Sequence, residues 1–282
     1  MTFAVCAGVR AALPLLALLL AAPGLAQTRP AAADLPLWEF GAGAFAVSQQ
    51  AYPGASEQVR RGLALPFLIY RGEYLRADRD NLGLRAINQP GYEVDIGFAG
   101  AFGSRADDTQ ARRGMPELGT LVEFGPRLKW HLGPVGRDGR LRAEFALRGV
   151  FDLNDSFRNK GASFEPRLVW EQRGADNWRY GASAGALFGS RKLADTFYSV
   201  APADALPGRP AYSAESGLIA MRFGVNASRE VTPDLRLFLF GRLDSVAGAA
   251  NRASPLVQKS TGSSVGVGLA YTFARSSRRA SD

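Results

Sequence analysis

The sequence has one cysteine, one histidine and, after its first 26 residues, no long apolar run. Cys6 precedes the apolar stretch 11–20. Because the rest of the sequence has no cysteine, a secreted domain held together by disulfides is excluded. No later stretch approaches 18 uninterrupted apolar residues, so no transmembrane helix is predicted after the N-terminal segment. A Ser-His-acid hydrolase would need His131 as its general base, and no serine stands two residues after it.

The N-terminal segment has the pattern of an export signal. Arg10 precedes the run AALPLLALLL, and small residues follow before a predicted cleavage between Ala26 and Gln27. We therefore predict a signal peptide over residues 1–26 and export across the inner membrane. The formal net charge is +8 without a basic run, which favours an anionic lipid or polysaccharide surface over nucleic acid as a partner.

Strict alternation of apolar with small or polar residues is the main feature that is present. Residues 262–273 read GSSVGVGLAYTF, so one face of the expected strand is apolar and the other has little bulk. Residues 117–133, 139–152, 161–173 and 234–244 repeat the alternation with charges of both signs on the second face. Strands of this length with one apolar face predict a transmembrane β-barrel whose charged face lines the lumen.

The charges expected in the lumen pair across strands in a salt-bridged, hydrated interior, which we favour over a selective pore. They are Glu123, Arg127, Arg142, Glu144, Arg148, Glu165, Arg167, Arg222, Arg236, Arg242 and Asp244.

The breaks between these segments are alternately short and long along the sequence. Outer-membrane barrels place short turns in the periplasm and long loops outside, so we predict an all-β, antiparallel up-and-down barrel. Counting the segments gives about 12 strands, with 10 as the alternative because residues 73–89 alternate weakly. The barrel is expected over residues 27–273, with a short basic periplasmic tail at 274–282. Pro126 and Pro166 interrupt two strands, and we expect local bulges there.

The four tryptophans give an independent test of this topology. Trp38, Trp130, Trp170 and Trp178 all fall at strand ends beside short turns. Aromatic side chains favour the membrane–water interface, so these residues are predicted to form a periplasmic aromatic girdle.

The last strand resembles the assembly signal of bacterial outer-membrane barrels, which ends in spaced aromatic residues after a glycine. Gly266, Gly268, Tyr271 and Phe273 match this signal. The match departs from the usual signal because nine residues follow Phe273, among them three arginines.

Three further segments resemble the MipA/OmpV family of outer-membrane proteins. These segments are YPGAS at 52–56 with LPFLIYRG at 65–72, DTFYSV at 195–200 with the prolines that follow it, and SPLV at 254–257. The resemblance implies an outer-membrane barrel without catalytic residues. It also implies a scaffold that joins a murein lytic transglycosylase to a bifunctional penicillin-binding protein, or else a surface antigen or adhesin.

From these patterns we expect a non-enzymatic protein of the Gram-negative outer membrane, without cofactor or metal, in contact with membrane lipid and lipopolysaccharide. A scaffold for murein synthesis and hydrolysis, or a role in envelope integrity, is the first hypothesis. A surface-loop binding protein, an adhesin or a narrow pore is the alternative.

Overall fold

The computed structural model describes residues 35–71, 76–77, 83–89, 91–101 and 109–280. These residues form a 12-stranded antiparallel sheet, as the sequence predicts, if the two-residue strand β3 is counted. The strands are β1 (Trp38–Gln50), β2 (Gln58–Arg71), β3 (Arg76–Ala77), β4 (Gly83–Gln89), β5 (Tyr92–Ala101), β6 (Leu121–Val135), β7 (Gly139–Asp152), β8 (Arg158–Arg173), β9 (Trp178–Gly189), β10 (Gly217–Glu230), β11 (Leu235–Ser245) and β12 (Thr261–Arg275). The helices are α1 (Arg191–Tyr198) and the 3-10 turns η3 (Gln110–Arg112) and η4 (Pro202–Asp204).

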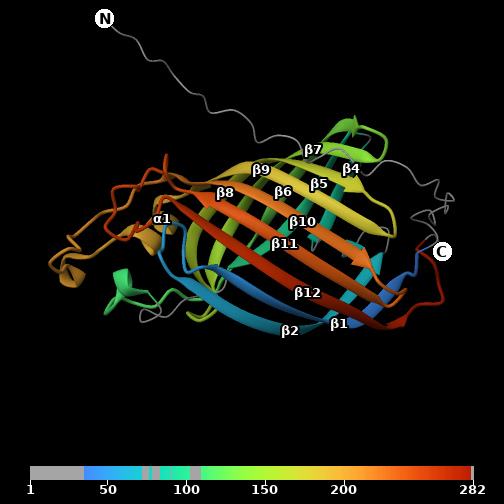
Figure 1. Ribbon diagram of the computed structural model, residues 1–282, viewed down its shortest axis with the longest axis horizontal. Helices are drawn as coiled ribbons and strands as arrows, with labels where there is room; N and C mark the ends of the chain where they lie inside the picture. Colours follow the sequence, from blue (N-terminus) through green and yellow to red (C-terminus); the bar gives the residue numbers. More distant parts are fainter. Residues whose placement is uncertain (1–34, 72–75, 78–82, 90, 102–108, 281–282) are drawn as a thin grey trace, which may run out of the picture.

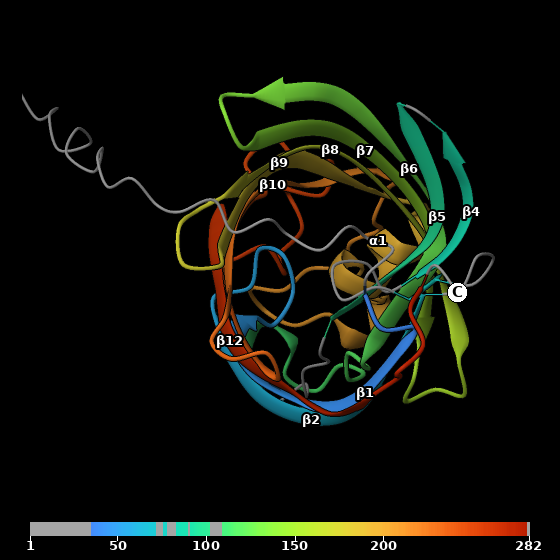
Figure 2. The same cartoon turned by 90° about the vertical axis from the view of Figure 1, so that its right-hand side faces the viewer.

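The sheet curls into a barrel in which consecutive strands are neighbours. β12 pairs with β1, so the first and last strands join and the order runs β3-β2-β1-β12 and on to β5-β4. The two ends of this order, β3 and β4, approach within 8 Å between Cα atoms. Figure 2, which looks along the barrel, shows the strands as a ring.

Alternation sets which side chains face outward, because directly paired residues on adjacent strands share a face. Leu239 pairs with Val267, and both lie on the outward apolar face. At the next paired position, Phe240 pairs with Gly266 on the inner face. The outer face is apolar from strand to strand, as expected for a wall that meets lipid.

The bulges predicted at the two prolines are not present. Pro126 pairs with Ile96 and Pro166 with Phe145, and the register shifts of β6–β7 and β7–β8 fall elsewhere, at His131/Gly133 and Val150/Phe151. A proline lacks only the amide hydrogen, so it leaves a gap in one ladder without inserting a residue.

The two ends of the barrel differ. At the end that we call the turn end, short turns join β6 to β7, β8 to β9 and β10 to β11. At the other end, residues 51–57, 109–120, 190–216 and 246–260 fold together into what we call the loop cap (Figure 1). In the view along the barrel, α1 lies across the bore (Figure 2).

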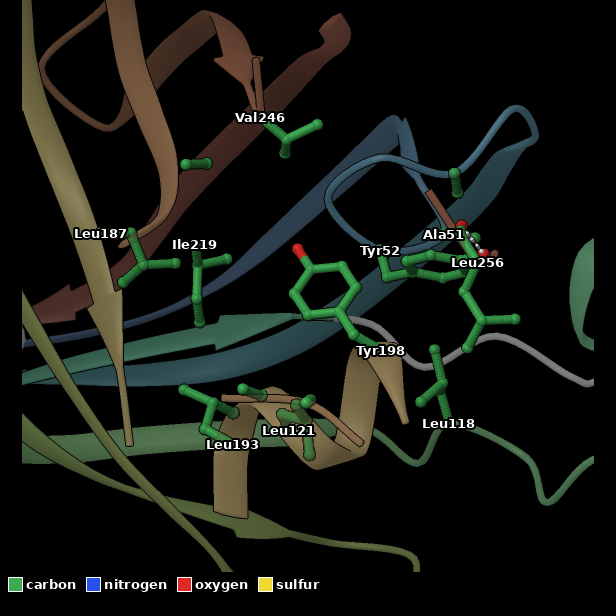
Figure 3. Packing of buried hydrophobic residues seen from close by; sticks show 14 of the residues in the cluster. Ala51, Tyr52, Leu118, Leu121, Leu187, Leu193, Tyr198, Ile219, Val246 and Leu256 are labelled. Atoms are coloured by element: carbon green, nitrogen blue, oxygen red, sulfur yellow. Dashed lines mark hydrogen bonds between the residues drawn. The ribbon is translucent and has the colours of Figure 1, made fainter. Parts of the chain in front are cut away.

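The most deeply buried apolar cluster lies mainly in the loop cap. Tyr52, Leu193, Tyr198 and Leu256 are almost fully buried there and pack in one cluster with Ile219 of β10 (Figure 3). A barrel wall is one layer thick and turns one face to lipid, so a two-sided core forms where the loops stack across the mouth.

Helix α1 begins after its N-cap residue, Ser190. The Ser190 side chain accepts a hydrogen bond from the Leu193 amide and another from the Ala162 amide of β8, which fixes the helix to the wall. Within the described residues, no helix is long and apolar enough to span a membrane.

Candidate functional site in the lumen and the loop cap

The charged residues predicted for the lumen lie together on the inner face of the barrel. Strand pairing places Glu123, Arg127, Arg142, Glu144 and Arg148 there on β6 and β7. Glu165, Arg167, Arg222, Arg236, Arg242 and Asp244 lie on the same face of β8, β10 and β11. Most of these residues are buried or half-buried, because long side chains from neighbouring strands cover one another.

Six of these residues form an alternating series of ion pairs, which we call the ion chain. Arg148 Nη1 lies 3.0 Å from a Glu165 oxygen, and Arg222 Nη1 lies 3.2 Å from the other. Arg222 Nε is 3.3 Å from Asp244, which also receives Arg242 Nε at 3.1 Å. In spatial order the ion chain runs Glu123, Arg148, Glu165, Arg222, Asp244 and Arg242.

A second cluster centres on Glu144, which is almost fully buried. Its two oxygens accept from Arg142 at 2.6 Å and from Arg167 at 2.5 Å, and Arg142 also pairs with Glu171 at 2.6 Å. Carboxylates that receive two guanidinium groups are well satisfied, so this part of the lumen is filled and rigid.

Sequence reasoning missed two acidic residues of the lumen. Glu93 and Asp95 on β5 pair with Lys129, and Asp95 also binds Arg127 through two nitrogens at 2.9 and 2.6 Å. The signal was present in the two acids spaced two apart in YEVDIGFAGA, because that spacing places them on one face.

Sequence reasoning also missed that part of the inner face is apolar. Pairing places Phe45, Leu63, Leu65, Phe238 and Phe240 on the inner face of β1, β2 and β11, and the inner positions of β12 between them include Gly266 and Gly268. A cluster of apolar side chains therefore interrupts the charged lining of the lumen.

The segments that carry the family resemblance meet in the loop cap. The Tyr52 hydroxyl donates to the Leu256 carbonyl at 2.7 Å, and the Tyr198 hydroxyl donates to the Pro53 carbonyl at 3.0 Å. Ser254 Oγ in turn donates to the Tyr198 carbonyl at 2.7 Å. Residues about 50 to 200 positions apart are thereby joined, which gives these segments a shared structural role.

Two arginines link the remaining parts of the loop cap through backbone carbonyls. Arg112 donates to Thr196, Phe197 and Pro116, and its guanidinium lies 5.8 Å from the centroid of the Tyr52 ring. Arg209 donates to Ala111, Arg113 and Asp204 carbonyls.

Burial within the cap changes the acidity of its tyrosines. Burial raises the pKa of Tyr52 to about 12, although the nearby Arg112 charge opposes the shift. Burial likewise raises the pKa of Tyr198. Both hydroxyls therefore remain protonated donors in neutral solution.

The structure places all four tryptophans at the turn end. Trp130, Trp170 and Trp178 point outward by strand register, and Trp38 opens β1 at the same end. Trp178 stacks on Tyr180 with ring centroids 5.7 Å apart, and the Arg229 guanidinium lies 5.7 Å from the Trp178 ring. The assignment of this ring of aromatics to a membrane interface stays a prediction.

The residues of the predicted assembly signal divide between the two faces of β12. Gly266 and Gly268 lie inside, and Tyr271 and Phe273 lie outside with ring centroids 5.5 Å apart. Whether they act as an assembly signal stays a prediction. The predicted cleavage point at Ala26 and Gln27 lies outside the described residues.

The predicted tail at 274–282 begins within the last strand and packs against the turn end. β12 continues to Arg275, whose side chain pairs with Asp234. Residues 276–280 continue this antiparallel pairing onto the residues just before β1, where the Leu37 amide donates to the Arg278 carbonyl and the Ala280 amide to the Leu35 carbonyl. Backbone hydrogen bonds hold the tail against the turn end.

His131 lies on the inner face at the turn end, paired with Arg142 and exposed. Among the described residues no group of three or more His, Cys, Asp or Glu side chains is arranged to hold a metal ion. The site is thus a lumen of paired charges with a cluster of apolar side chains, covered at one end by the loop cap.

Comparison with known proteins gives one family and several distant structures. A family model described as MltA-interacting protein MipA matches residues 41–273. No curated protein matches the chain.

Three solved structures illustrate the distant structural similarity. A bacterial polysaccharide outer membrane secretin is 8% identical, with TM-score 0.43, covering 83% of this chain and 98% of its own. OprB of Pseudomonas putida is 8% identical, with TM-score 0.40 and coverage of 84% and 94%. OmpT of Vibrio cholerae is 7% identical, with TM-score 0.35 and coverage of 84% and 97%. The barrel assignment itself rests on the strand pairing described above.

Proposed function

The chain belongs to the MipA family, described as MltA-interacting protein, and from this premise we propose that it is a non-enzymatic scaffold in the outer membrane. In this role the barrel anchors a murein lytic transglycosylase and a bifunctional penicillin-binding protein at its periplasmic end. The protein is an outer-membrane β-barrel, and such barrels direct their short turns to the periplasm. The turn end is therefore the surface that periplasmic enzymes meet.

The observation that carries this proposal is the hairpin of β6 and β7. The pairing of β6 with β5 ends at Trp130, whereas β6 continues to Val135 and keeps β7 as its partner. The segment Leu132–Val135 therefore extends past its neighbour and leaves one edge of β6 without a paired strand in the described structure. Exposed strand edges accept an added strand from another protein.

The side chains on this segment suit a protein contact. Leu132 and Val135 are 47% and 43% exposed, and they lie beyond Trp130 on the same strand. A tryptophan at the interface sets the limit of the membrane, so apolar residues beyond it face the periplasm. Exposed apolar groups at that position are typical of a binding surface.

Site-specific photo-crosslinking in cells tests the scaffold role. A photoreactive residue at Leu132 or Val135 is expected to capture a murein lytic transglycosylase or a penicillin-binding protein, identified by mass spectrometry. The matched control is Leu153, an exposed leucine in the β7–β8 turn at the cap end. Capture of murein enzymes equally from Leu153, or from none of the three positions, would refute the scaffold role.

Binding at the cell surface is a second candidate function, and the loop cap favours it. Its four segments are held by many tertiary hydrogen bonds, so their exposed surface is pre-organised. Lipopolysaccharide or another cell would be the partner. Deleting residues 202–210 should abolish adhesion while leaving the turn-end crosslinks intact if this candidate is correct.

A further inference from the structure

The inner wall formed by β2, β1, β12 and β11 carries apolar side chains in three successive rows of paired residues, with Arg61 on β2 in the first row and Arg236 on β11 in the third. One row joins Val47, Gly266 and Phe240, and the next joins Leu63, Phe45, Gly268 and Phe238. A third row adds Leu65, which pairs with Gly43. We call Phe45, Leu63, Leu65, Phe238 and Phe240 the apolar wall.

The apolar wall is accessible from the lumen. Leu65 is 49% exposed, Phe240 43% and Phe45 38%, although pairing directs all three inward. Glycines in the neighbouring positions let the aromatic rings lie flat. A Cβ atom built on Gly266 would stand 2.2 Å from Cε1 of Phe240. The wall is therefore a flat apolar surface that faces an aqueous lumen, an arrangement that favours an apolar ligand.

The guanidinium group of Arg242 borders this wall on the side of the loop cap and can donate further hydrogen bonds. Arg242 follows Phe240 by two residues and so shares its face. It is the last residue of the ion chain, where Asp244 is its one carboxylate partner among the described residues, and its side chain is 39% exposed. Its Nη2 makes a long 3.4 Å contact with Ser264 Oγ. A guanidinium group has five donors, so Arg242 can also receive an anionic ligand.

We propose that the lumen binds a single-chain anionic amphiphile, with its chain against the apolar wall and its acidic head at Arg242. Three rows across four strands span about 14 by 14 Å at the usual strand and residue spacings, and the apolar side chains between Arg61 and Arg236 within this area suit one acyl chain. The loop cap closes the bore beyond Arg242, so the ligand enters head first from the turn end. This binding is independent of the scaffold role.

The charges around Arg242 determine the sign of the head group. Asp244, the nearest carboxylate, is buried and already pairs with both Arg222 and Arg242. A cationic head would meet the positive charge of Arg242 without an available carboxylate. A carboxylate or phosphate head would instead pair with Arg242 and continue the alternation of acidic and basic groups along the ion chain.

Fluorescence titration of the full-length barrel in phosphatidylcholine nanodiscs tests the proposal, with empty nanodiscs subtracted. The probe is dansyl-labelled undecanoate, and its neutral counterpart is the dansyl-labelled undecanol. Leu65→Gln and Phe240→Gln should each weaken binding of both probes about tenfold, the equivalent of one lost apolar contact of this size. Arg242→Gln should weaken the carboxylate about tenfold and leave the alcohol unchanged.

A matched control lies on another part of the inner face. His131 on β6 is exposed and faces the lumen, and β6 is not adjacent to the strands of the apolar wall, so His131→Gln should bind both probes as the wild type does. The shift in electrophoretic mobility on heating verifies that each variant is a folded barrel. Unchanged binding in both wall variants, or equal binding of the alcohol and the carboxylate by the wild type, would overturn the proposal. So would equal weakening by His131→Gln.

Discussion

At the scale of single residues, burial in the lumen is tolerated because each charge has a partner on a neighbouring strand. Glu165 on β8 illustrates this arrangement, since its two oxygens bind Arg148 of β7 and Arg222 of β10. A carboxylate placed between two guanidinium groups connects three strands. Removing it leaves two cations facing each other in a region of low water content.

Glu165→Gln is therefore expected to destabilise the folded barrel by about 3 kcal/mol. Urea unfolding followed by the mobility shift of the folded barrel measures this change. Glu171→Gln is the control, because Glu171 is 52% exposed and its partner Arg142 retains Glu144. An exposed pair contributes less than about 1 kcal/mol, so equal destabilisation by the two variants would contradict this account.

The hydroxyl of Tyr52 links the stability of the loop cap to pH. Its pKa is raised from 10.0 to about 12, so the folded cap holds its proton more tightly than the unfolded loop does. The stabilisation is complete below pH 10 and is lost as the pH rises toward 12.

We expect the unfolding temperature of the wild type to fall between pH 10 and pH 12 more steeply than that of Tyr52→Phe. Differential scanning fluorimetry measures both, and tyrosinate absorbance should show one late-titrating group fewer in the variant. Tyr52→Phe should itself be less stable at pH 7 by about 1 kcal/mol, because the Leu256 carbonyl loses its donor. Parallel pH profiles would show that Tyr52 does not control the cap.

At the scale of secondary-structure elements, the short helix α1 depends on its attachment to the barrel wall. Eight residues are too few for a stable isolated helix, so its N-cap and its buried face determine whether it forms. Ser190 serves both purposes, since its oxygen accepts from Leu193 in the helix and from Ala162 in β8. Gly161 stands close by with φ +112°, where a larger residue would meet Ser190 Oγ.

Ser190→Ala should weaken α1 by about 1 kcal/mol because it removes the acceptor of two amides. Hydrogen–deuterium exchange over residues 191–198 should become faster, while exchange in β11 stays unchanged. Ser190→Thr keeps the oxygen and is expected to retain most of the protection. Equal exchange in the alanine and threonine variants would show that the cap hydrogen bond is unimportant.

At the scale of the whole molecule, the barrel has one mouth covered by the loop cap. Segments from four loops meet over the bore, and Tyr52 and Tyr198 lie at their centre (Figure 3). We expect a close-packed plug of this kind to block the passage of ions, although the wall below it is lined with charges. The closed mouth also separates the lumen from the outer loops, which leaves the turn end as the way in.

Planar-bilayer recording should show wild-type conductance close to baseline. The double variant Tyr52→Ala and Tyr198→Ala should open the cap and produce discrete conductance steps. Each truncation in a packed cluster lowers the free energy of unfolding by about 3 to 5 kcal/mol. Leu206→Ala is the control, because Leu206 is exposed on the surface of the cap. Large open-channel steps in the wild type would contradict a closed cap.

The barrel and the faces of its strands were predictable because alternation is a local property. Residues such as Leu239 and Arg242 differ in position by an odd number, which places them on opposite faces of any strand. The bulges expected at Pro126 and Pro166 were wrong because proline restricts the donor side of one ladder only. The apolar wall was missed because β1 and β2 carry large apolar residues on both faces, Phe40 and Leu68 outward and Phe45 and Leu65 inward, so period-two alternation gives no clear direction there.

The sequence by itself determined a membrane-type barrel, its strands and the inward direction of its charges, because period-two patterning needs no knowledge of distant residues. The tertiary structure decided which charges pair, that four distant loops form one cap, and that four strands present an apolar wall beside Arg242. Those features depend on register and closure, which bring together residues up to about 200 positions apart. Such contacts arise only when β12 meets β1, and no local pattern encodes that meeting.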